Sequence, residues 1–139
     1  MGLELNRVEE PFVFELKNDE GVICGIDANP SIGGKGKGFR PMELLAGSLA
    51  GCASIDILLI LKKQRIVPTH FSIKIETKRK DGVPAIFEEI KLIFEVNEEV
   101  AQEKLEKAIS LTLEKYCSVS ASLKEDVKVV FEVNYKQSL

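Results

Sequence analysis

The sequence contains one histidine, no closely spaced cysteine pair and no long uncharged run, and each scarcity excludes a class of protein. With His70 alone and no CxxC pair, the ligand spacing typical of zinc sites is missing, so we expect no metal. Nothing in the spacing of His70 supports a histidine-dependent hydrolase. The longest uncharged run, from Leu44 to Ile55, has 12 residues, whereas a membrane span needs about 18 or more. We therefore expect no transmembrane helix.

An excess of basic charge is also lacking. The formal net charge is −3, so no global field attracts nucleic acid or an anionic membrane, and we expect neither as a partner. Residues 1–10 are charged and lack the apolar stretch of a secretory signal. Because structural disulfides are rare in the cytoplasm, three cysteines without a signal predict a cytoplasmic protein. The length of 139 residues predicts one domain, spanning residues 1–139.

The order of apolar patterns predicts an α+β fold. Alternating apolar and polar residues predict strands, and apolar residues three or four positions apart predict helices. Strands are expected at residues 3–7, 12–16, 22–26, 71–77, 87–96 and 127–135, and helices at 41–65, 98–117 and, as a short turn, 118–123. We expect Asn97 to cap the second helix and Asp81-Gly82 to form a hairpin turn. Strands grouped in a meander and a hairpin indicate α+β rather than a doubly wound sheet.

The predicted helix over residues 41–65 is the segment around which the chain is organised. Its length of about 25 residues corresponds to a rod of roughly 37 Å. Between Ala46 and Ser54 every side chain except that of Leu49 is small, which favours close approach of another backbone. The glycine-rich loop before it carries lysines, but it lacks the spacing of a phosphate-binding loop, so a flexible lid or connector is the favoured interpretation.

The three cysteines differ in their sequence context. Cys24 lies in an apolar strand and is best interpreted as a buried structural thiol. Cys52 lies in mid-helix among residues too small to shield it. Cys117 precedes a serine-rich segment, and a helical turn that begins there favours the thiolate at Cys117 through its dipole. Composition alone leaves open whether Cys52 and Cys117 are functional.

Two segments together resemble the OsmC/Ohr family, the osmotically inducible protein C and organic hydroperoxide resistance proteins. They are RPMELLAGSLAGCASIDILLILKK and EKYCSVSASL, whose cysteines are 65 residues apart. The similarity covers essentially the whole chain and is strongest to the small OsmC-like branch. The resemblance implies an intertwined homodimer whose two long central helices pack back to back, with the active sites at the dimer interface.

The resemblance also implies a mechanism without a cofactor. By matching positions, Cys52 is the peroxidatic thiol that reduces an organic hydroperoxide and becomes a sulfenic acid. Cys117 is the resolving thiol that captures it as a disulfide. An external dithiol or a lipoylated protein then restores both thiols.

The family mechanism further uses an arginine held by a glutamate, and here the match is incomplete. Met42 occupies the expected glutamate position and Glu43 is the next residue along. Arg7, Arg40 and Arg79 are the candidate arginines, and the sequence does not choose among them. Asp56 lies four residues after Cys52 on the same helical face, where a carboxylate opposes ionisation of the thiol.

Two hypotheses follow from these residues. The favoured one is a cytoplasmic, cysteine-dependent peroxidase that acts on organic hydroperoxides. The alternative is a homodimeric binding module that has the fold with weak or no peroxidase activity. Met42 and Asp56 motivate this alternative, and a small apolar molecule near Phe39, Leu44 and the loop is its expected ligand.

Overall fold

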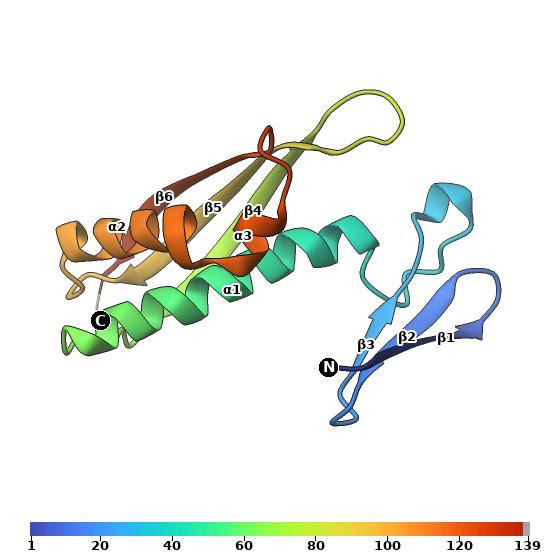
Figure 1. Ribbon diagram of the computed structural model, residues 1–139, viewed down its shortest axis with the longest axis horizontal. Helices are drawn as coiled ribbons and strands as arrows, with labels where there is room; N and C mark the ends of the chain where they lie inside the picture. The colour runs from blue at the N-terminus through green and yellow to red at the C-terminus, as the bar shows by residue number, and fades with distance from the viewer. Residues whose placement is uncertain (138–139) are drawn as a thin grey trace. The chain divides into compact units, whose positions relative to one another are not determined.

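The structure is a computed structural model that describes residues 1–137 (Figure 1). Residues Met1–Leu45 form one compact unit and the residues from Ala46 onward form a second. Whether the chain is one domain over residues 1–139 stays a prediction.

The first unit contains an antiparallel meander, as the sequence predicts. Strands β1 (Leu3–Glu9), β2 (Val13–Asn18) and β3 (Ile23–Ile26) pair in the order β1-β2-β3. Asn18 ends β2 and holds the turn to β3, because its side-chain oxygen accepts hydrogen bonds from the backbone N–H groups of Glu20 and Val22. All of β1 is exposed except its last residue.

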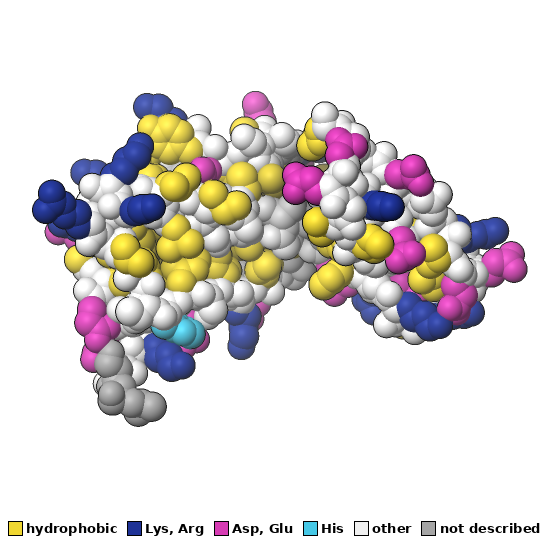
Figure 2. Space-filling model, turned by 90° about the horizontal axis from the view of Figure 1, so that it is seen from below, with side chains coloured by type: hydrophobic (Ala, Val, Ile, Leu, Met, Phe, Trp, Pro, Cys, Tyr) yellow, Lys and Arg dark blue, Asp and Glu magenta, His cyan; other side chains and the backbone are white. Residues whose placement is uncertain are grey.

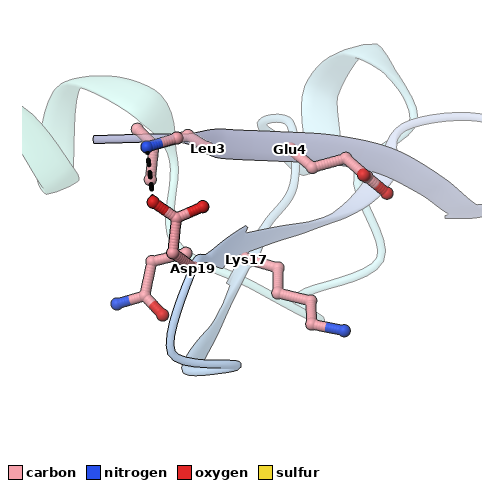
Figure 3. A pocket seen from close by; sticks show the side chains of 6 residues that line it. Leu3, Glu4, Lys17 and Asp19 are labelled. Carbon is pink, nitrogen blue, oxygen red and sulfur yellow. Dashed lines mark hydrogen bonds between the residues drawn. The ribbon is translucent and has the colours of Figure 1, made fainter.

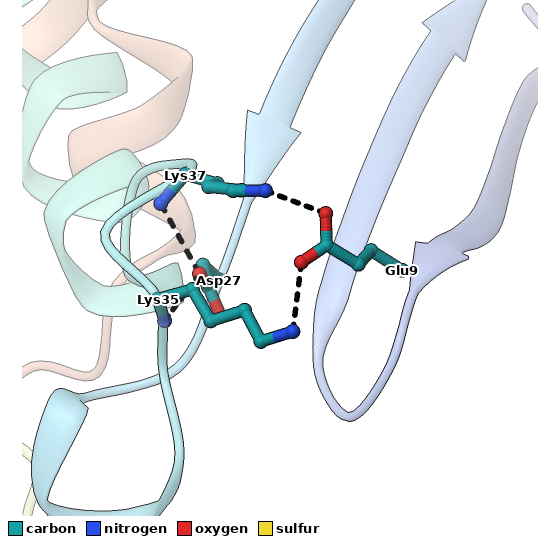
Figure 4. A network of polar contacts seen from close by, with 4 residues as sticks. All are labelled: Glu9, Asp27, Lys35 and Lys37. Atoms are coloured by element: carbon teal, nitrogen blue, oxygen red, sulfur yellow. Dashed lines mark hydrogen bonds and ion pairs between the residues drawn. The ribbon is translucent and has the colours of Figure 1, made fainter.

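The connection from β3 to the long helix is held by hydrogen bonds to the buried carboxylate of Asp27 (Figure 4). Asp27 is 2% exposed and accepts backbone N–H groups of Ala28 at 2.7 Å, Lys35 at 2.9 Å and Lys37 at 3.2 Å. The hydrogen bond from Lys35 contributes most to holding the pKa of Asp27 below its usual range. The Nζ atoms of the same lysines reach Glu9 at 2.8 and 2.6 Å. This loop is therefore organised by hydrogen bonds, and both lysines already have a carboxylate partner.

Gly34, in this connection, cannot be replaced by a larger residue for steric reasons. A Cβ on Gly34 would lie 1.8 Å from the carbonyl oxygen of Ala28, so only glycine fits there. A short 3-10 turn, η1 (Pro30–Ile32), precedes Gly34 and is capped by the side chain of Asn29.

Helix α1 (Pro41–Lys63) confirms the predicted long helix and ends two residues before the expected position. Arg65 then adopts a φ of 61°, which turns the chain out of the helical path. One face of α1 is buried, with residues spaced three or four apart, as expected for a core-facing stripe. The buried residues are Ala46, Leu49, Ala50, Ala53, Ile57 and Leu61.

The opposite face of α1 is apolar yet exposed. A Cβ on Gly47 or Gly51 would meet no atom within 4 Å, and Ile55 is 64% exposed. Leu58 and Leu59 are also exposed. We call these five residues the open face of α1; Figure 2 shows hydrophobic side chains gathered over this helix.

By length and composition α1 is apolar enough to cross a membrane, with a mean hydropathy of 2.1 over an 18-residue window. The length of the uncharged run does not reveal this high hydropathy, because Asp56, the one charged residue between Leu44 and Leu61, interrupts the run. Only 33% of the window is buried inside the chain. The core helix of a soluble protein passes the same test, so the absence of a membrane span stays a prediction.

The second unit contains a mixed sheet in the order β4-β5-β6. Strands β4 (Phe71–Arg79) and β5 (Phe87–Asn97) form the predicted antiparallel hairpin, and β6 (Lys128–Lys136) runs parallel to β5. Alternate residues of β5 are fully buried, and the ring of Phe94 makes edge contacts with Phe71 and Phe131. Figure 1 shows the three strands with α1 and α2 beside them.

The helices between β5 and β6 differ from expectation in one respect. Helix α2 (Gln102–Leu111) continues into a π-helical segment, η2 (Thr112–Tyr116), and a short helix, α3 (Ser118–Ser122), follows as predicted. The prediction that Asn97 caps α2 is wrong. Asn97 ends β5, and its buried Oδ1 accepts the backbone N–H groups of Thr69 at 2.9 Å and His70 at 3.2 Å. Helix α2 has Ala101 at its N-cap instead.

Candidate functional site

The second unit brings the two predicted redox cysteines together. Cys52 lies on α1 and is half-buried, whereas Cys117 is 2% exposed, and both are free thiols. The two thiols lie close enough to interact, because Cys52 contributes to the raised pKa of Cys117. Proximity of two thiols from distant parts of the chain is what thiol–disulfide chemistry requires.

Thr112 and Ser120 hold Cys117 in place. The π-helical segment places the Cys117 backbone N–H 2.9 Å from the Thr112 carbonyl oxygen, five residues earlier. Cys117 is then the N-cap of α3, and its Sγ accepts the backbone N–H of Ser120 at 3.4 Å. The serine-rich pattern predicted the helical turn, but no local pattern marks Thr112. The hydroxyl of Thr112 is fully buried and has no hydrogen-bond partner among residues 1–137.

The sequence predicts that the Cys117 thiolate is favoured, whereas in the structure the pKa of the Cys117 thiol is raised. Burial raises the pKa of the Cys117 thiol. The backbone N–H groups of Ser120 and Val119 oppose this by stabilising the thiolate, whereas the neighbouring Cys52 raises the pKa further. The expectation that the α3 dipole favours the thiolate is therefore outweighed, because α3 is short and the thiol is buried.

In the first unit, the side chain of Glu43 contacts the main chain of Arg40. The Glu43 carboxylate accepts the backbone N–H of Arg40 at 2.8 Å, which is a capping-box contact at the start of α1. Met42, at the position where the family resemblance implies a glutamate, is half-buried. The contact of Glu43 is thus with the main chain of Arg40.

The other two candidate arginines also make local contacts. In the second unit Arg79 donates from Nε to the carbonyl oxygen of Ala85 and lies over the Phe87 ring, 5.8 Å from its centre. In the first unit Arg7 pairs with Glu10 at 3.7 Å and donates to the Pro11 carbonyl oxygen at 3.4 Å. The described contacts of Arg7 and Arg79 are thus with residues no more than eight positions away in the sequence.

Asp56 lies one helical turn after Cys52 and is half-buried. It therefore shares the border between the buried and exposed faces of α1 with the thiol. Within the described part of the chain, no hydrogen bond or ion pair joins its carboxylate.

Two shallow surface hollows have mixed polar and apolar linings that contain no thiol. The first, of about 220 Å³, is lined by Gly2, Leu3, Glu4, Lys17, Asn18 and Asp19 (Figure 3). There the backbone nitrogen of Gly2 donates to the Asp19 carboxylate at 2.8 Å. The second, of about 350 Å³, lies on the β4-β5-β6 sheet. Among residues 1–137, no group of three or more His, Cys, Asp or Glu side chains is arranged to hold a metal ion.

Comparison with known proteins adds a family and close structural likenesses. A family model described as "OsmC-like protein" matches residues 34–132. Protein YhfA of Escherichia coli is 32% identical over 94 residues, which are 67% of this chain and 70% of YhfA.

Solved structures match over nearly the full length. The crystal structure of a hypothetical protein from Aquifex aeolicus is 32% identical, covers 97% of this chain and 96% of that chain, and has a TM-score of 0.79. The organic hydroperoxide resistance protein OhrB of Bacillus subtilis is 18% identical, covers 96% of this chain and 98% of that chain, and has a TM-score of 0.66. At 18% identity this second likeness shows the fold alone. The predicted α+β fold is confirmed.

Proposed function

Because the chain belongs to the OsmC-like family, we propose that it is a peroxidase that reduces organic hydroperoxides, with Cys52 as the reacting thiol and Cys117 as the resolving thiol. The observation that carries the proposal is the proximity of these two free thiols, which are close enough for Cys52 to raise the pKa of Cys117. Several solved structures with the same fold are named organic hydroperoxide resistance proteins. Catalysis needs no bound cofactor in this proposal.

The first step takes place at Cys52. Its thiolate attacks the outer oxygen of the hydroperoxide, so that a sulfur–oxygen bond forms and the O–O bond breaks. The departing alkoxide takes a proton and leaves as an alcohol. Cys52 becomes a sulfenic acid, with its sulfur oxidised by two electrons as the peroxide is reduced by two.

The second step uses the protonated state of Cys117. The raised pKa of Cys117 favours its protonated form, in keeping with the resolving role proposed for it. The Cys117 sulfur attacks the Cys52 sulfenic acid, the sulfur–sulfur bond forms, and the Cys117 proton leaves with the hydroxyl group as water. An external dithiol or a lipoylated protein then reduces the disulfide and is itself oxidised to a disulfide.

A second copy of the chain completes the proposed enzyme. The open face of α1 presents Gly47 and Gly51 with free space above them, beside the exposed Ile55, Leu58 and Leu59. Small residues allow two helix backbones to approach closely, and the flanking apolar side chains lose water on contact. We assign this face to a homodimer in the cytoplasm, where reduced thiols persist.

The experiment compares three cysteine variants. One equivalent of cumene hydroperoxide should convert the reduced protein to a form two hydrogens lighter, with a Cys52–Cys117 disulfide in the peptide map. Cys117→Ser should instead yield a Cys52 sulfenic acid that dimedone traps, and Cys52→Ser should yield neither product. Cys24→Ser is the matched control and should retain turnover with dithiothreitol. Unchanged turnover in Cys52→Ser would contradict the proposal.

One observation favours the alternative, a homodimeric binding module with weak or no peroxidase activity. The Glu43 carboxylate caps its own helix, so it is not free to hold an arginine side chain by that oxygen. In this alternative a small apolar molecule binds near Phe39, which is 56% exposed, and Leu44. Slow alkylation of Cys52 at neutral pH together with absent turnover would support it.

A further inference from the structure

The carboxylate of Asp56 is placed to act on anything that approaches Cys52. Residues four apart on a helix have side chains about 5–6 Å apart at their Cβ atoms. The two residues share the border of the buried face of α1, and both are half-buried. Because the site is only partly open to water, salt screens such a charge less than it screens a fully exposed one.

None of the ion pairs among the described residues 1–137 includes Asp56. The ion pairs of the second unit join other groups, such as Lys80 with Asp126 at 2.7 Å and Lys91 with Glu132 at 3.3 Å. No hydrogen bond or ion pair within the described chain involves Asp56. An acid that caps a helix or forms an ion pair has a structural role. An unpaired carboxylate beside a thiol instead attracts or repels charged molecules that approach the thiol.

We propose that Asp56 determines specificity at Cys52 by selecting neutral reactants over anionic ones. This inference rests on the proposed function for its substrate, and it narrows the substrate class to hydroperoxides without a carboxylate near the peroxide. It applies equally to the reductant: a neutral dithiol is favoured over an anionic thiol such as glutathione. The physical basis is the repulsion between like charges at short range.

The first test needs only an accessible thiol. The alkylation rates of Cys52 are measured with neutral iodoacetamide and anionic iodoacetate, and the ratio is normalised to that of free cysteine. We expect the normalised ratio to exceed one in the unaltered chain and to fall about tenfold in Asp56→Asn, since a unit charge at this range has that order of effect. Asp56→Glu should retain the ratio. Glu76→Gln removes the same charge from an exposed position on β4 and should leave the ratio unchanged.

Two results would overturn the proposal. One is a normalised ratio of one in the unaltered chain, a measurement that does not depend on whether any variant folds. The other is an equal fall in Asp56→Asn and Glu76→Gln, which would mean that net charge rather than position matters.

The second test uses turnover. Cumene hydroperoxide, which is neutral, is compared with a hydroperoxide that bears a carboxylate. Asp56→Asn should raise kcat/KM for the anionic substrate relative to the neutral one by about tenfold. An unchanged ratio would overturn the proposal. If the unaltered chain reduces neither substrate, the peroxidase proposal fails, and the alkylation ratio still decides the role of Asp56.

Discussion

The Glu43 carboxylate accepts the backbone N–H of Arg40 at 2.8 Å, so the acid nearest to the start of α1 closes the first turn of its own helix. Arg40 is the N-cap residue and Glu43 the third helical residue, which is the spacing of a capping box. The contact satisfies a backbone donor that no helical partner can reach. Glu43 therefore has a structural role that does not involve Cys52.

Removing this cap should weaken the fold. Glu43→Ala loses the hydrogen bond to Arg40 and should lower the free energy of unfolding by about 1 kcal/mol, as losses of helix caps do. Urea denaturation followed by circular dichroism measures the change. Glu43→Gln is the matched control, because glutamine serves equally in a capping box and should retain both stability and turnover. Lost turnover in a stable Glu43→Gln protein would show instead that the carboxylate charge is needed for catalysis.

The buried carboxylate of Asp27 predicts a pH-dependent stability. Its folded-state pKa lies below the unfolded value, so the ionised group contributes stability above about pH 3.9 that is lost as the pH falls through the folded pKa. Asp27→Asn should therefore lower the melting temperature at neutral pH, and its difference from the unaltered chain should shrink as the pH falls below about 4. Asp19→Asn, an exposed acid with one backbone donor, is the control and should show a smaller difference. An Asp27→Asn difference that does not vary with pH would contradict this account.

Most of the fold was predictable because its elements follow local patterns. The alternation in residues 71–77 and 87–96 predicted β4 and β5 to within two residues, and apolar residues three or four positions apart predicted α1. Asn97 was misassigned because Asn followed by two acids is a typical helix start. Its actual partners, the backbone N–H groups of Thr69 and His70, come from 27 to 28 residues earlier and leave no local signal.

The site was predictable in part for a similar reason. The redox pair Cys52 and Cys117 stays a prediction from the family resemblance, and the structure places the two thiols close enough to interact. The direction of the pKa shift of Cys117 was not predictable. The local sequence indicates that a helix begins there, but the burial that raises the pKa depends on tertiary packing. The roles of Arg7, Arg40 and Arg79 stay open, since each contact in the structure is made with a neighbouring residue.

The coupling between the two thiols predicts how Cys117 titrates. Because its pKa is raised, alkylation of Cys117 by iodoacetamide should be slow at neutral pH and should accelerate only in alkaline solution. Cys52→Ser removes the two contributions that come from Cys52, so the pH profile of Cys117 should move to lower pH. It should stay above the profile of a free cysteine, since burial is the largest cause of the shift. Mass spectrometry of the Cys117 peptide across pH measures both effects, and an unmoved profile in Cys52→Ser would show that the thiols do not interact.

The open face of α1 predicts that bulk at Gly51 acts on assembly rather than on the fold of one chain. A Cβ at this position meets no atom within 4 Å, so Gly51→Leu leaves the intrachain packing intact and improves the helix propensity by up to about 1 kcal/mol. Between two closely packed helices, however, the leucine would hold the backbones apart. We expect sedimentation equilibrium to show weaker self-association of Gly51→Leu with unchanged helical content. Gln64→Leu adds a similar side chain just beyond the end of α1 and serves as the control. Equal self-association of Gly51→Leu and the unaltered chain would mean that the two helices do not meet at Gly51.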